Sequence, residues 1–347
     1  MGYTIVQPEQ ESCKEIFMSL WARNFGAIPR ERYRWLYENN PSGPPTSYFL
    51  QDESKNEIVG AISLFPRTLF IDGEKTPGFI CGDLAVDKEH RALGPAVKLL
   101  KAAINKCESE APCVLFGIPN QNSGPVMRRV GFSVLDDVCE MTLVLRSAPY
   151  ILKRINMPTV AKAAGFLLDP ILHLRHSNLG VSRQKGHIAD LAIQDEDEAN
   201  VSNLFPPTGF SLIGERNIKF LQWRFMNSPY ANYQIFTIEY EEGKKPHSYI
   251  VFRMNEKRAQ IADFFAPDKK TFSRLFSSFT AYQKAMGTES IAVSFAGDGS
   301  LVECLQKQGY SLRARTQKLL IYTSGKNGLT DKVKNGRWYL TSADNDT

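Results

Sequence analysis

The chain has 347 residues and a formal net charge of +5, so it is long enough for two domains with full hydrophobic cores. This mildly basic balance is not typical of a nucleic-acid-binding protein, and no run of 18 apolar residues is present to span a membrane. The first ten residues lack the basic and apolar regions of a signal peptide, so none is expected. The six cysteines form no C-x-x-C pair, and we expect them to be thiols of a reduced, cytoplasmic protein.

An aromatic segment precedes the first predicted strands. It runs from Arg32 through Trp35, Tyr37 and Glu38 to Pro41, and a Ser42-Gly-Pro-Pro45 turn follows. Large aromatic residues in such a segment are most often part of the core, although they also line binding pockets. Both interpretations stay open for Trp35.

A strand, a polar loop and a helix are predicted between residues 79 and 107. The apolar run Phe79–Val86 has the length of a strand, and the loop after it carries Arg91. Apolar residues then recur at i, i+3, i+7 and i+10 from Val97 to Cys107, which is one face of a helix. Pro95 suits the first helical turn, where the missing N–H costs nothing. The free N–H groups of such a helix start bind anions, above all phosphate, and Gly94 permits close approach.

A second strand–helix unit follows directly. Residues 114–120 form an apolar strand that ends at Asn120, and a short helix then leads to the pair Gly131-Phe132. Together with Arg91-x-x-Gly94-x-Ala96, this unit resembles the acyl-CoA-binding core of the GNAT (GCN5-related) N-acyltransferases over roughly residues 3–145.

The resemblance implies a fold and a cofactor. The fold is α/β (α+β), with a mixed, largely antiparallel central sheet flanked by helices. The cofactor is acetyl-CoA or another acyl-CoA, whose pantetheine arm fits between the two strands and whose pyrophosphate lies at the loop. The implied cofactor-binding residues are Leu84, Ala85, Val86, Arg91, Ala92, Leu93, Gly94, Pro95, Ala96 and Asn120. Ala92 stands where the family often has glycine.

The resemblance also suggests how catalysis works, with one departure. Transfer needs a base for the amine proton and a donor for the leaving thiolate. Asp83 is the nearest carboxylate and is the candidate base, directly or through water, although a structural role is the competing interpretation. The usual acid is a tyrosine four residues before the exit Gly-Phe, and that position holds Met127. The remaining candidates for the acid are Tyr33, Tyr37 and Ser123, and the acceptor-binding candidates are Trp35 and Glu38.

Three sequence matches in register predict an internal repeat. Trp35 and Pro41 correspond to Trp223 and Pro229, Asp83 corresponds to Asp263, and Gly131-Phe132 corresponds to Gly309-Tyr310. The second copy has no glycine in residues 270–276, so we expect a degenerate copy that has a structural or acceptor-shaping role. The predicted domains are therefore 1–146 and 188–347, in the tandem arrangement that N-myristoyltransferase and the Fem aminoacyltransferases also show.

A basic, amphipathic helical linker is predicted over 147–187. Residues 146–187 hold seven lysines and arginines against Asp169 alone. Such a stretch packs across two domains, or makes peripheral contact with a membrane or a lipid-linked substrate. His173 and His176 have no evident third ligand, so we expect no metal site.

The sequence therefore predicts an N-acyltransferase that moves an acetyl or short acyl group to a small-molecule amine. The tandem build suggests an amino sugar or a sugar-linked amine as the acceptor. The alternative is a non-catalytic acyl-CoA-binding or scaffold protein, which Met127 and the degenerate copy favour. An aminoacyltransferase that uses charged tRNA is disfavoured by the modest charge, and no nucleic acid partner is expected.

Overall fold

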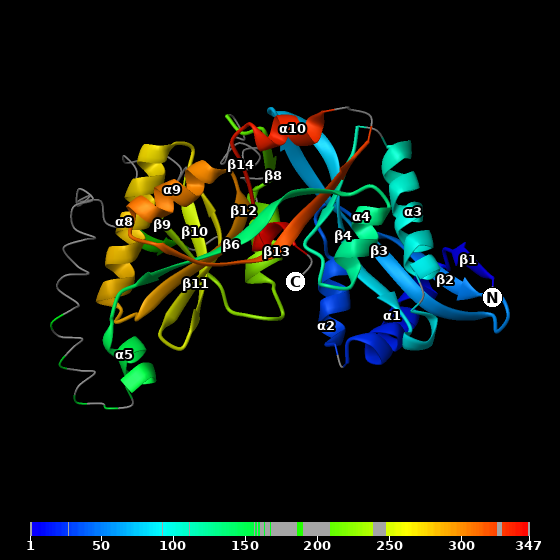
Figure 1. Ribbon diagram of the computed structural model, residues 1–347, viewed down its shortest axis with the longest axis horizontal. Coiled ribbons are helices and arrows are strands. Elements are labelled where there is room, and N and C mark those ends of the chain that lie inside the picture. The colour runs from blue at the N-terminus through cyan, green and yellow to red at the C-terminus, as the bar shows by residue number, and fades with distance from the viewer. Residues whose placement is uncertain are drawn as a thin grey trace.

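A computed structural model of the chain describes residues 2–26, 28–91, 93–110, 112–155, 186–189, 209–238, 248–324 and 328–345, with single residues at 157, 159, 163 and 167. The fourteen strands found there belong to one mixed sheet that runs through the whole molecule (Figure 1). Its main path is β1-β2-β3-β4-β5-β13-β6-β12-β11-β10-β9-β7. The mixed α/β class expected from the sequence is confirmed.

Residues 2–144 are called the N-terminal half below. Its elements are β1 (Tyr3–Val6), α1 (Gln10–Asn24), α2 (Arg30–Tyr33), the π-helical turn η1 (Arg34–Glu38), β2 (Thr46–Asp52), β3 (Glu57–Ile71), β4 (Glu74–Val86), the 3₁₀ turn η2 (Lys88–His90), α3 (Leu93–Ser109), β5 (Val114–Gly117), α4 (Ser123–Arg129) and β6 (Ser133–Val144).

Residues 186–345 are called the C-terminal half, and α5 (Ala148–Ile155) lies between the halves in sequence. The C-terminal elements are β7 (Gly186–Ala189), β8 (Leu212–Gly214), α7 (Ile218–Leu221), the π-helical turn η5 (Gln222–Met226), β9 (Gln234–Ile238), β10 (Tyr249–Asn255), β11 (Arg258–Phe265), α8 (Lys269–Ala285), β12 (Ser290–Gly297), α9 (Gly299–Lys307), β13 (Ser311–Thr323), α10 (Leu329–Lys334), β14 (Trp338–Thr341) and the 3₁₀ turn η6 (Ser342–Asp344).

The strand–loop–helix unit predicted from the sequence is present, with one shift. Strand β4 contains the predicted residues 79–86, and α3 carries the expected apolar face, on which Leu100 and Cys107 are fully buried. Helix α3 begins at Leu93, so Gly94 lies in its first turn and not in the loop before it. Gly131 follows α4 at φ +110°, a conformation that glycine adopts without strain, and Gly309 follows α9 at +85°.

The two halves exchange a strand. Strand β6 leaves the N-terminal half and pairs with β12, with Met141 opposite Val293. Strand β13 returns from the C-terminal half and pairs with β5, with Ile321 opposite Phe116. These two long strands cross the middle of the molecule side by side (Figure 1). Each half therefore completes the sheet of the other, and the sheet is continuous instead of divided.

A buried group of charged side chains joins the halves. Arg67 of β3 donates to Asp344 Oδ1 at 2.8 Å, and Arg216 donates to Asp344 Oδ2 at 2.8 Å and to Asp263 Oδ1 at 3.1 Å. Two arginines thus face two aspartates, and all four are at most 3% exposed. Pairing of this kind is what permits charges to be buried.

The structure describes the predicted linker mainly at its start, where α5 lies. Helix α5 exposes Tyr150, Leu152 and Ile155. His173 and His176 lie outside the described residues, as does most of 147–187, and the division into 1–146, 147–187 and 188–347 stays a prediction. Within the described part of the chain, no helix is both long and apolar enough to cross a membrane.

Candidate acyl-CoA cleft and active site

A cleft opens where β4 and β5 separate. The two strands pair in parallel from Gly78–Val114 to Ile80–Phe116, and β4 then continues to Val86 without β5 beside it. The strands part at a bulge, because Asp83 and Leu84 of β4 face a single residue of β3. Asp83 sits there at φ +49°, in the left-handed region.

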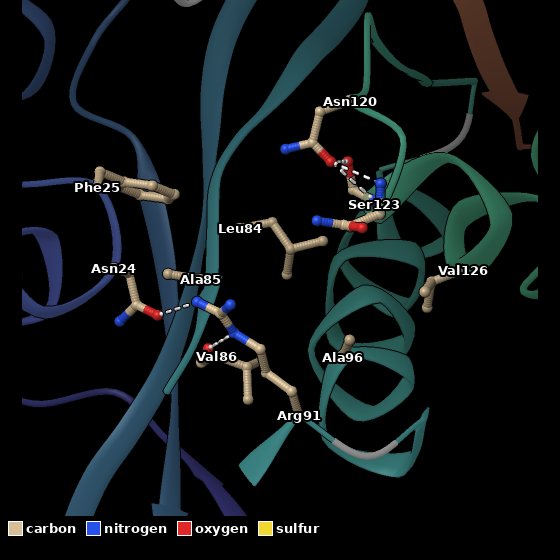
Figure 2. Close-up of a pocket in the computed structure, with 11 residues that line it drawn as sticks. Asn24, Phe25, Leu84, Ala85, Val86, Arg91, Ala96, Asn120, Ser123 and Val126 are labelled. Atoms are coloured by element: carbon tan, nitrogen blue, oxygen red, sulfur yellow. Dashed lines mark hydrogen bonds between the residues drawn. The ribbon is translucent and has the colours of Figure 1, made fainter. Parts of the chain in front are cut away.

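The separation of the strands leaves a cavity of about 590 Å³, called the N-terminal cavity below. Figure 2 shows the β4 residues on one side of it and residues of α3 and α4 on the other. Its lining residues are Asn24, Phe25, Leu84, Ala85, Val86, Arg91, Ala96, Asn120, Asn122, Ser123 and Val126.

The cavity brings together most of the residues that the sequence suggested for the cofactor. Leu84, Ala85, Val86, Arg91, Ala96 and Asn120 all line it, and Ser123 does so as well. Leu93, Gly94 and Pro95 form the first turn of α3 next to Ala96, and Ala92 lies outside the described residues. The open space around Gly94 leaves room for a ligand at the helix start. The sequence did not indicate Asn24 and Phe25 as cavity residues, because they lie at the end of α1, more than 50 residues before the end of β4.

Arg91 is held in place by two hydrogen bonds. Its Nε donates to the carbonyl oxygen of Val86 at 2.9 Å, and its Nη2 donates to Asn24 Oδ1 at 2.9 Å (Figure 2). Two of the five guanidinium N–H donors are used in this way. The charge is therefore fixed at the cavity wall beside the start of α3.

Asn120 is oriented by the helix that follows it. Its Oδ1 accepts from the backbone N–H of Asn122 at 2.9 Å and of Ser123 at 3.0 Å, and from the Ser123 hydroxyl at 3.1 Å (Figure 2). The amide oxygen thus stabilises the start of α4. The Ser123 hydroxyl lies at the cavity with its own proton directed to Asn120.

Asp83 is not among the residues that line the cavity. Both carboxylate oxygens accept from Arg32 at 2.8 Å, and Oδ2 also accepts from the Tyr37 hydroxyl at 2.6 Å. The Ser63 hydroxyl lies 2.8 Å from that of Tyr37. Burial and the neighbouring Asp83 charge raise the pKa of Tyr37 well above its usual value, so Tyr37 keeps its proton. Asp83 and Tyr37 therefore belong to one closed, buried network.

The other candidate residues lie away from the cavity. Glu38 is exposed and forms ion pairs with Lys14 at 3.5 Å and Arg34 at 3.8 Å. Tyr33 stacks on Tyr37 with ring centroids 4.5 Å apart, and burial raises the pKa of Tyr33 to about 12. Trp35 is buried against the C-terminal half. None of the lining residues is an Asp, Glu, His, Cys, Lys or Tyr.

Met127 lies buried under β5, with its methyl group 3.8 Å from where a side chain on Gly117 would begin. A thioether has no proton to donate. Met127 therefore takes the place of the usual acid in the packing without its chemistry.

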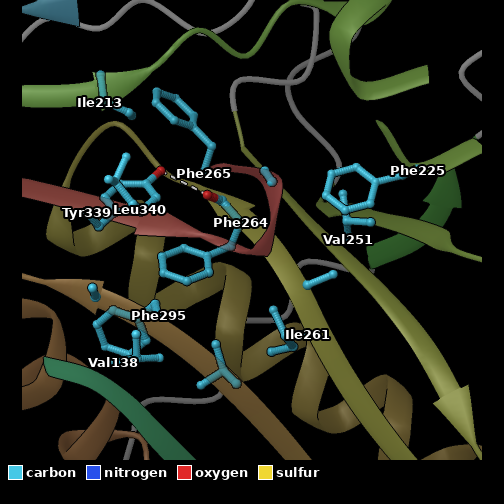
Figure 3. Packing of buried hydrophobic residues seen from close by; sticks show 14 of the residues in the cluster. Val138, Ile213, Phe225, Val251, Ile261, Phe264, Phe265, Phe295, Tyr339 and Leu340 are labelled. Atoms are coloured by element: carbon cyan, nitrogen blue, oxygen red, sulfur yellow. Dashed lines mark hydrogen bonds between the residues drawn. The ribbon is translucent and has the colours of Figure 1, made fainter. Parts of the chain in front are cut away.

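The C-terminal half has the same strand separation, but it is filled. Strands β11 and β12 pair as far as Ile261–Val293, and β14 then pairs with β12 on the side that β11 has left, with Thr341 opposite Phe295. The Tyr339 hydroxyl donates to the carbonyl oxygen of Phe264 at 2.8 Å, and the two rings stack (Figure 3).

The start of α8 is also occupied by the protein itself. Asp268 accepts from the backbone N–H of Thr271 at 2.8 Å, so a carboxylate stands at the helix start where a phosphate would bind. Strand β14 and Asp268 thus occupy the positions that correspond to the open strand separation and the open helix start of the N-terminal half.

Comparisons with known proteins agree with this geometry. Residues 6–135 match the family model for the acetyltransferase (GNAT) domain. A GCN5-related N-acetyltransferase from Anabaena variabilis has the same fold, with 13% identity, a TM-score of 0.62, and coverage of 93% of this chain and 73% of that chain. A probable N-acyltransferase from Enterococcus faecalis gives 15% identity, a TM-score of 0.65 and the same coverage.

A more distant structure carries a ligand. The N-myristoyltransferase of Saccharomyces cerevisiae, solved with bound myristoyl-CoA, is 12% identical with a TM-score of 0.52, over 92% of this chain and 82% of that one. No curated protein sequence matches the chain. The sheet and the separation of β4 and β5 define a GNAT-type fold. Residues 6–135 thus resemble a GNAT acetyltransferase domain in sequence, and the chain shares its fold with GNAT proteins over most of its length.

Proposed function

We propose that the protein is an N-acyltransferase that binds acetyl-CoA or another short acyl-CoA in the N-terminal cavity and transfers the acyl group to an amine. The observation that carries this proposal is the cavity itself. It lies between separated parallel strands and ends at the start of a 17-residue helix, with a fixed arginine beside it. A cleft with an arginine and a helix start at one end suits a molecule with a pyrophosphate and a flexible arm.

Each part of the cavity supplies a different contact. The backbone of Leu84 and Ala85 has no neighbour in β5 and is available to the pantetheine amides. The first turn of α3 and the Arg91 guanidinium bind the pyrophosphate. The side-chain amide nitrogen of Asn120 is a hydrogen-bond donor, so it suits a carbonyl oxygen of the pantetheine arm.

Transfer forms a C–N bond and breaks the C–S bond, so the amine loses a proton and the thiolate gains one. Ser123 is the hydroxyl among the lining residues, and its proton is directed to Asn120. We propose that it turns from Asn120 to donate this proton to the leaving thiolate and takes up the proton that the nitrogen loses. Asp83 accepts hydrogen bonds from Tyr37 and Arg32. To act as the base, Asp83 would have to lose these hydrogen bonds or receive the proton through them. We therefore propose that the amine reaches the cavity in its neutral form and that orientation supplies most of the rate.

An acyl-transfer assay tests this function. Release of CoA thiol from acetyl-CoA is measured with the full-length protein and a panel of amines that includes glucosamine. Ala96→Trp places an indole inside the cavity and is expected to abolish release, whereas Lys101→Trp on the exposed side of α3 keeps it. Equal activity of both variants and the unchanged protein would contradict the proposed site.

The second candidate is a non-catalytic acyl-CoA-binding or scaffold protein. The absence of a titratable acid or base among the cavity's lining residues favours it. Acyl-CoA binding without thiol release, with every amine of the panel, would select this alternative.

Three finer expectations stay proposals. An amino sugar or sugar-linked amine is one acceptor class, and a lipid-linked substrate that meets residues 147–187 is another. A cytoplasmic location is a proposal that rests on the six cysteines, which form no disulfide in this structure.

A further inference from the structure

A chain of hydrogen bonds leads from Arg91 at the N-terminal cavity to the end of α1. The Oδ1 of Asn24 accepts from Arg91 Nη2 at 2.9 Å (Figure 2), and its Nδ2 donates to Asp87 Oδ1 at 2.7 Å. Asp87 also accepts from Nε of Arg23 at 3.1 Å and from its Nη2 at 2.9 Å. These four residues are called the Arg91 network below.

The two ends of the network line different cavities. Asn24 and Arg91 are among the residues that line the N-terminal cavity. Arg23 and Asp87 line a separate cavity of about 540 Å³ and are not among the lining residues of the N-terminal one. A change at the Asp87 side chain therefore acts on a ligand in the N-terminal cavity through its neighbours, and not by contact.

The chemistry of the neighbours fixes the direction of the Asn24 side-chain amide. An ionised carboxylate only accepts hydrogen bonds, so Asp87 binds the NH₂ group of Asn24 and not its oxygen. The same nitrogen donates to the carbonyl oxygen of Leu20 at 3.0 Å. Both partners of the nitrogen are acceptors, and the amide oxygen is thereby directed to Arg91.

The groups that hold Arg91 are neutral. Its two acceptors are the amide oxygen of Asn24 and the carbonyl oxygen of Val86, whereas the Asp87 carboxylate forms its ion pair with Arg23. Neutral acceptors orient a guanidinium group without cancelling its charge. A side chain that is ordered before the ligand arrives also loses less conformational freedom when it binds the ligand. The network thus orients Arg91 and leaves its charge available to an anion.

We propose that Asn24 and Asp87 are positioning residues of the acyl-CoA site: Asp87 sets the direction of the Asn24 amide, and Asn24 holds Arg91 toward the pyrophosphate. This inference rests on the proposed acyl-CoA site. It extends the determinants of that site beyond the residues that line the cavity, to a carboxylate in the loop before α3. The network is expected to raise the affinity for CoA about fivefold, the effect of ordering one long side chain in advance.

A double-mutant cycle tests the proposal. Isothermal titration calorimetry gives the affinity for CoA of the full-length protein, of Asn24→Ala, of Arg91→Met and of the variant with both changes. We expect Asn24→Ala alone to weaken binding about fivefold. In the Arg91→Met background the same change should have no further effect, because no guanidinium group is left to position.

Asp87→Ala is taken through the same cycle. We expect it to weaken CoA binding about threefold with Arg91 present, since the Leu20 carbonyl still holds the Asn24 amide in part, and to have no effect in Arg91→Met. Asp137→Ala is the control, because it removes a carboxylate that pairs with Lys318 at 3.1 Å and lines neither cavity. Its affinity for CoA should equal that of the unchanged protein.

Three results would overturn the proposal. An equal loss from Asn24→Ala in both backgrounds would mean that Asn24 contacts CoA or only supports the cavity wall. Unchanged affinity in Asp87→Ala would remove Asp87 from the site. Unchanged affinity in Arg91→Met would mean that Arg91 binds no part of CoA, so that nothing is positioned.

The failure of this inference differs from the failure of the proposed function. If CoA does not bind the unchanged protein, the acyl-CoA site is wrong and the positioning residues are wrong with it. If CoA binds and Arg91→Met weakens it, while Asn24→Ala and Asp87→Ala do not, the acyl-CoA site stands and only the positioning role is wrong.

Discussion

Trp35 and Trp223 hydrogen-bond each other's backbone reciprocally. The indole N–H of Trp35 donates to the carbonyl oxygen of Trp223 at 2.7 Å, and the indole N–H of Trp223 donates to the carbonyl oxygen of Trp35 at 2.7 Å. Each tryptophan lies in a short π-helical turn, η1 or η5. Reciprocal contacts of this kind arise where two equivalent surfaces meet about a two-fold axis. The predicted repeat would produce such a pair where its two copies meet, and the repeat itself stays a prediction.

Loss of one indole N–H should destabilise the junction. Trp35→Phe keeps an aromatic ring but leaves the buried carbonyl of Trp223 without its donor, at an expected cost of about 1–3 kcal/mol. Trp223→Phe should cost a similar amount, because the geometry is symmetric. Denaturant unfolding measures both values. A cost for one variant and none for the other would show that the two bonds are not equivalent.

Asp83 is expected to act as a structural anion. Asp83→Asn removes the carboxylate that both ends of Arg32 bind, and breaking a buried pair costs about 3–5 kcal/mol. The double variant Arg32→Met with Asp83→Leu should recover most of that stability, since apolar side chains of similar size replace buried pairs well.

Acyl transfer by this double variant separates the two roles of Asp83. Rates within about tenfold of the unchanged protein are expected if the amine arrives neutral, since general-base catalysis contributes about 10²–10⁴-fold. A loss of more than a hundredfold in a variant with restored stability would identify Asp83 as the base.

The free energy of unfolding is expected to depend on pH through the carboxyl group of Asp344. Burial alone would raise the pKa of this carboxyl, but the charges of Arg216 and Arg67 hold it below its usual value. A lowered pKa stabilises the fold at every pH above the unfolded value of about 3.9, and this contribution is lost as pH falls through the folded pKa. The difference in free energy of unfolding between the unchanged protein and Asp344→Asn should therefore shrink below about pH 4. Asp136→Asn, at a surface pair with Arg315, should show little difference at any pH.

The chain is expected to bind one acyl-CoA. Strand β14 fills the separation between β11 and β12, and Asp268 occupies the start of α8. Asp268→Ala should cost about 1 kcal/mol as a lost helix cap and leave the affinity for CoA unchanged. A stoichiometry of two CoA molecules per chain in a titration would contradict the filled cleft.

The sequence predicted the parts of the site whose signals are local. The strand at 79–86, the apolar face of α3 and the glycines after α4 and α9 follow from periodicity and from backbone conformations that favour glycine. The exchange of β6 and β13 was not predictable, because the apolar residues of a strand do not specify which neighbouring strand pairs with it. The hydrogen bond from Arg32 to Asp83 joins residues that are 51 positions apart in the sequence. Helix and strand periodicities relate only near neighbours, so they could not predict it.

The most direct test of the acyl-CoA site is calorimetric titration of the full-length protein with acetyl-CoA and with CoA. We expect micromolar binding with one site per chain, and a loss of at least about tenfold in Arg91→Glu, since a carboxylate beside the start of α3 repels the pyrophosphate. Asn24→Ala keeps the Arg91 charge and should weaken binding less. No detectable binding of either compound, or unchanged affinity in Arg91→Glu, would contradict the N-terminal cavity as the acyl-CoA site.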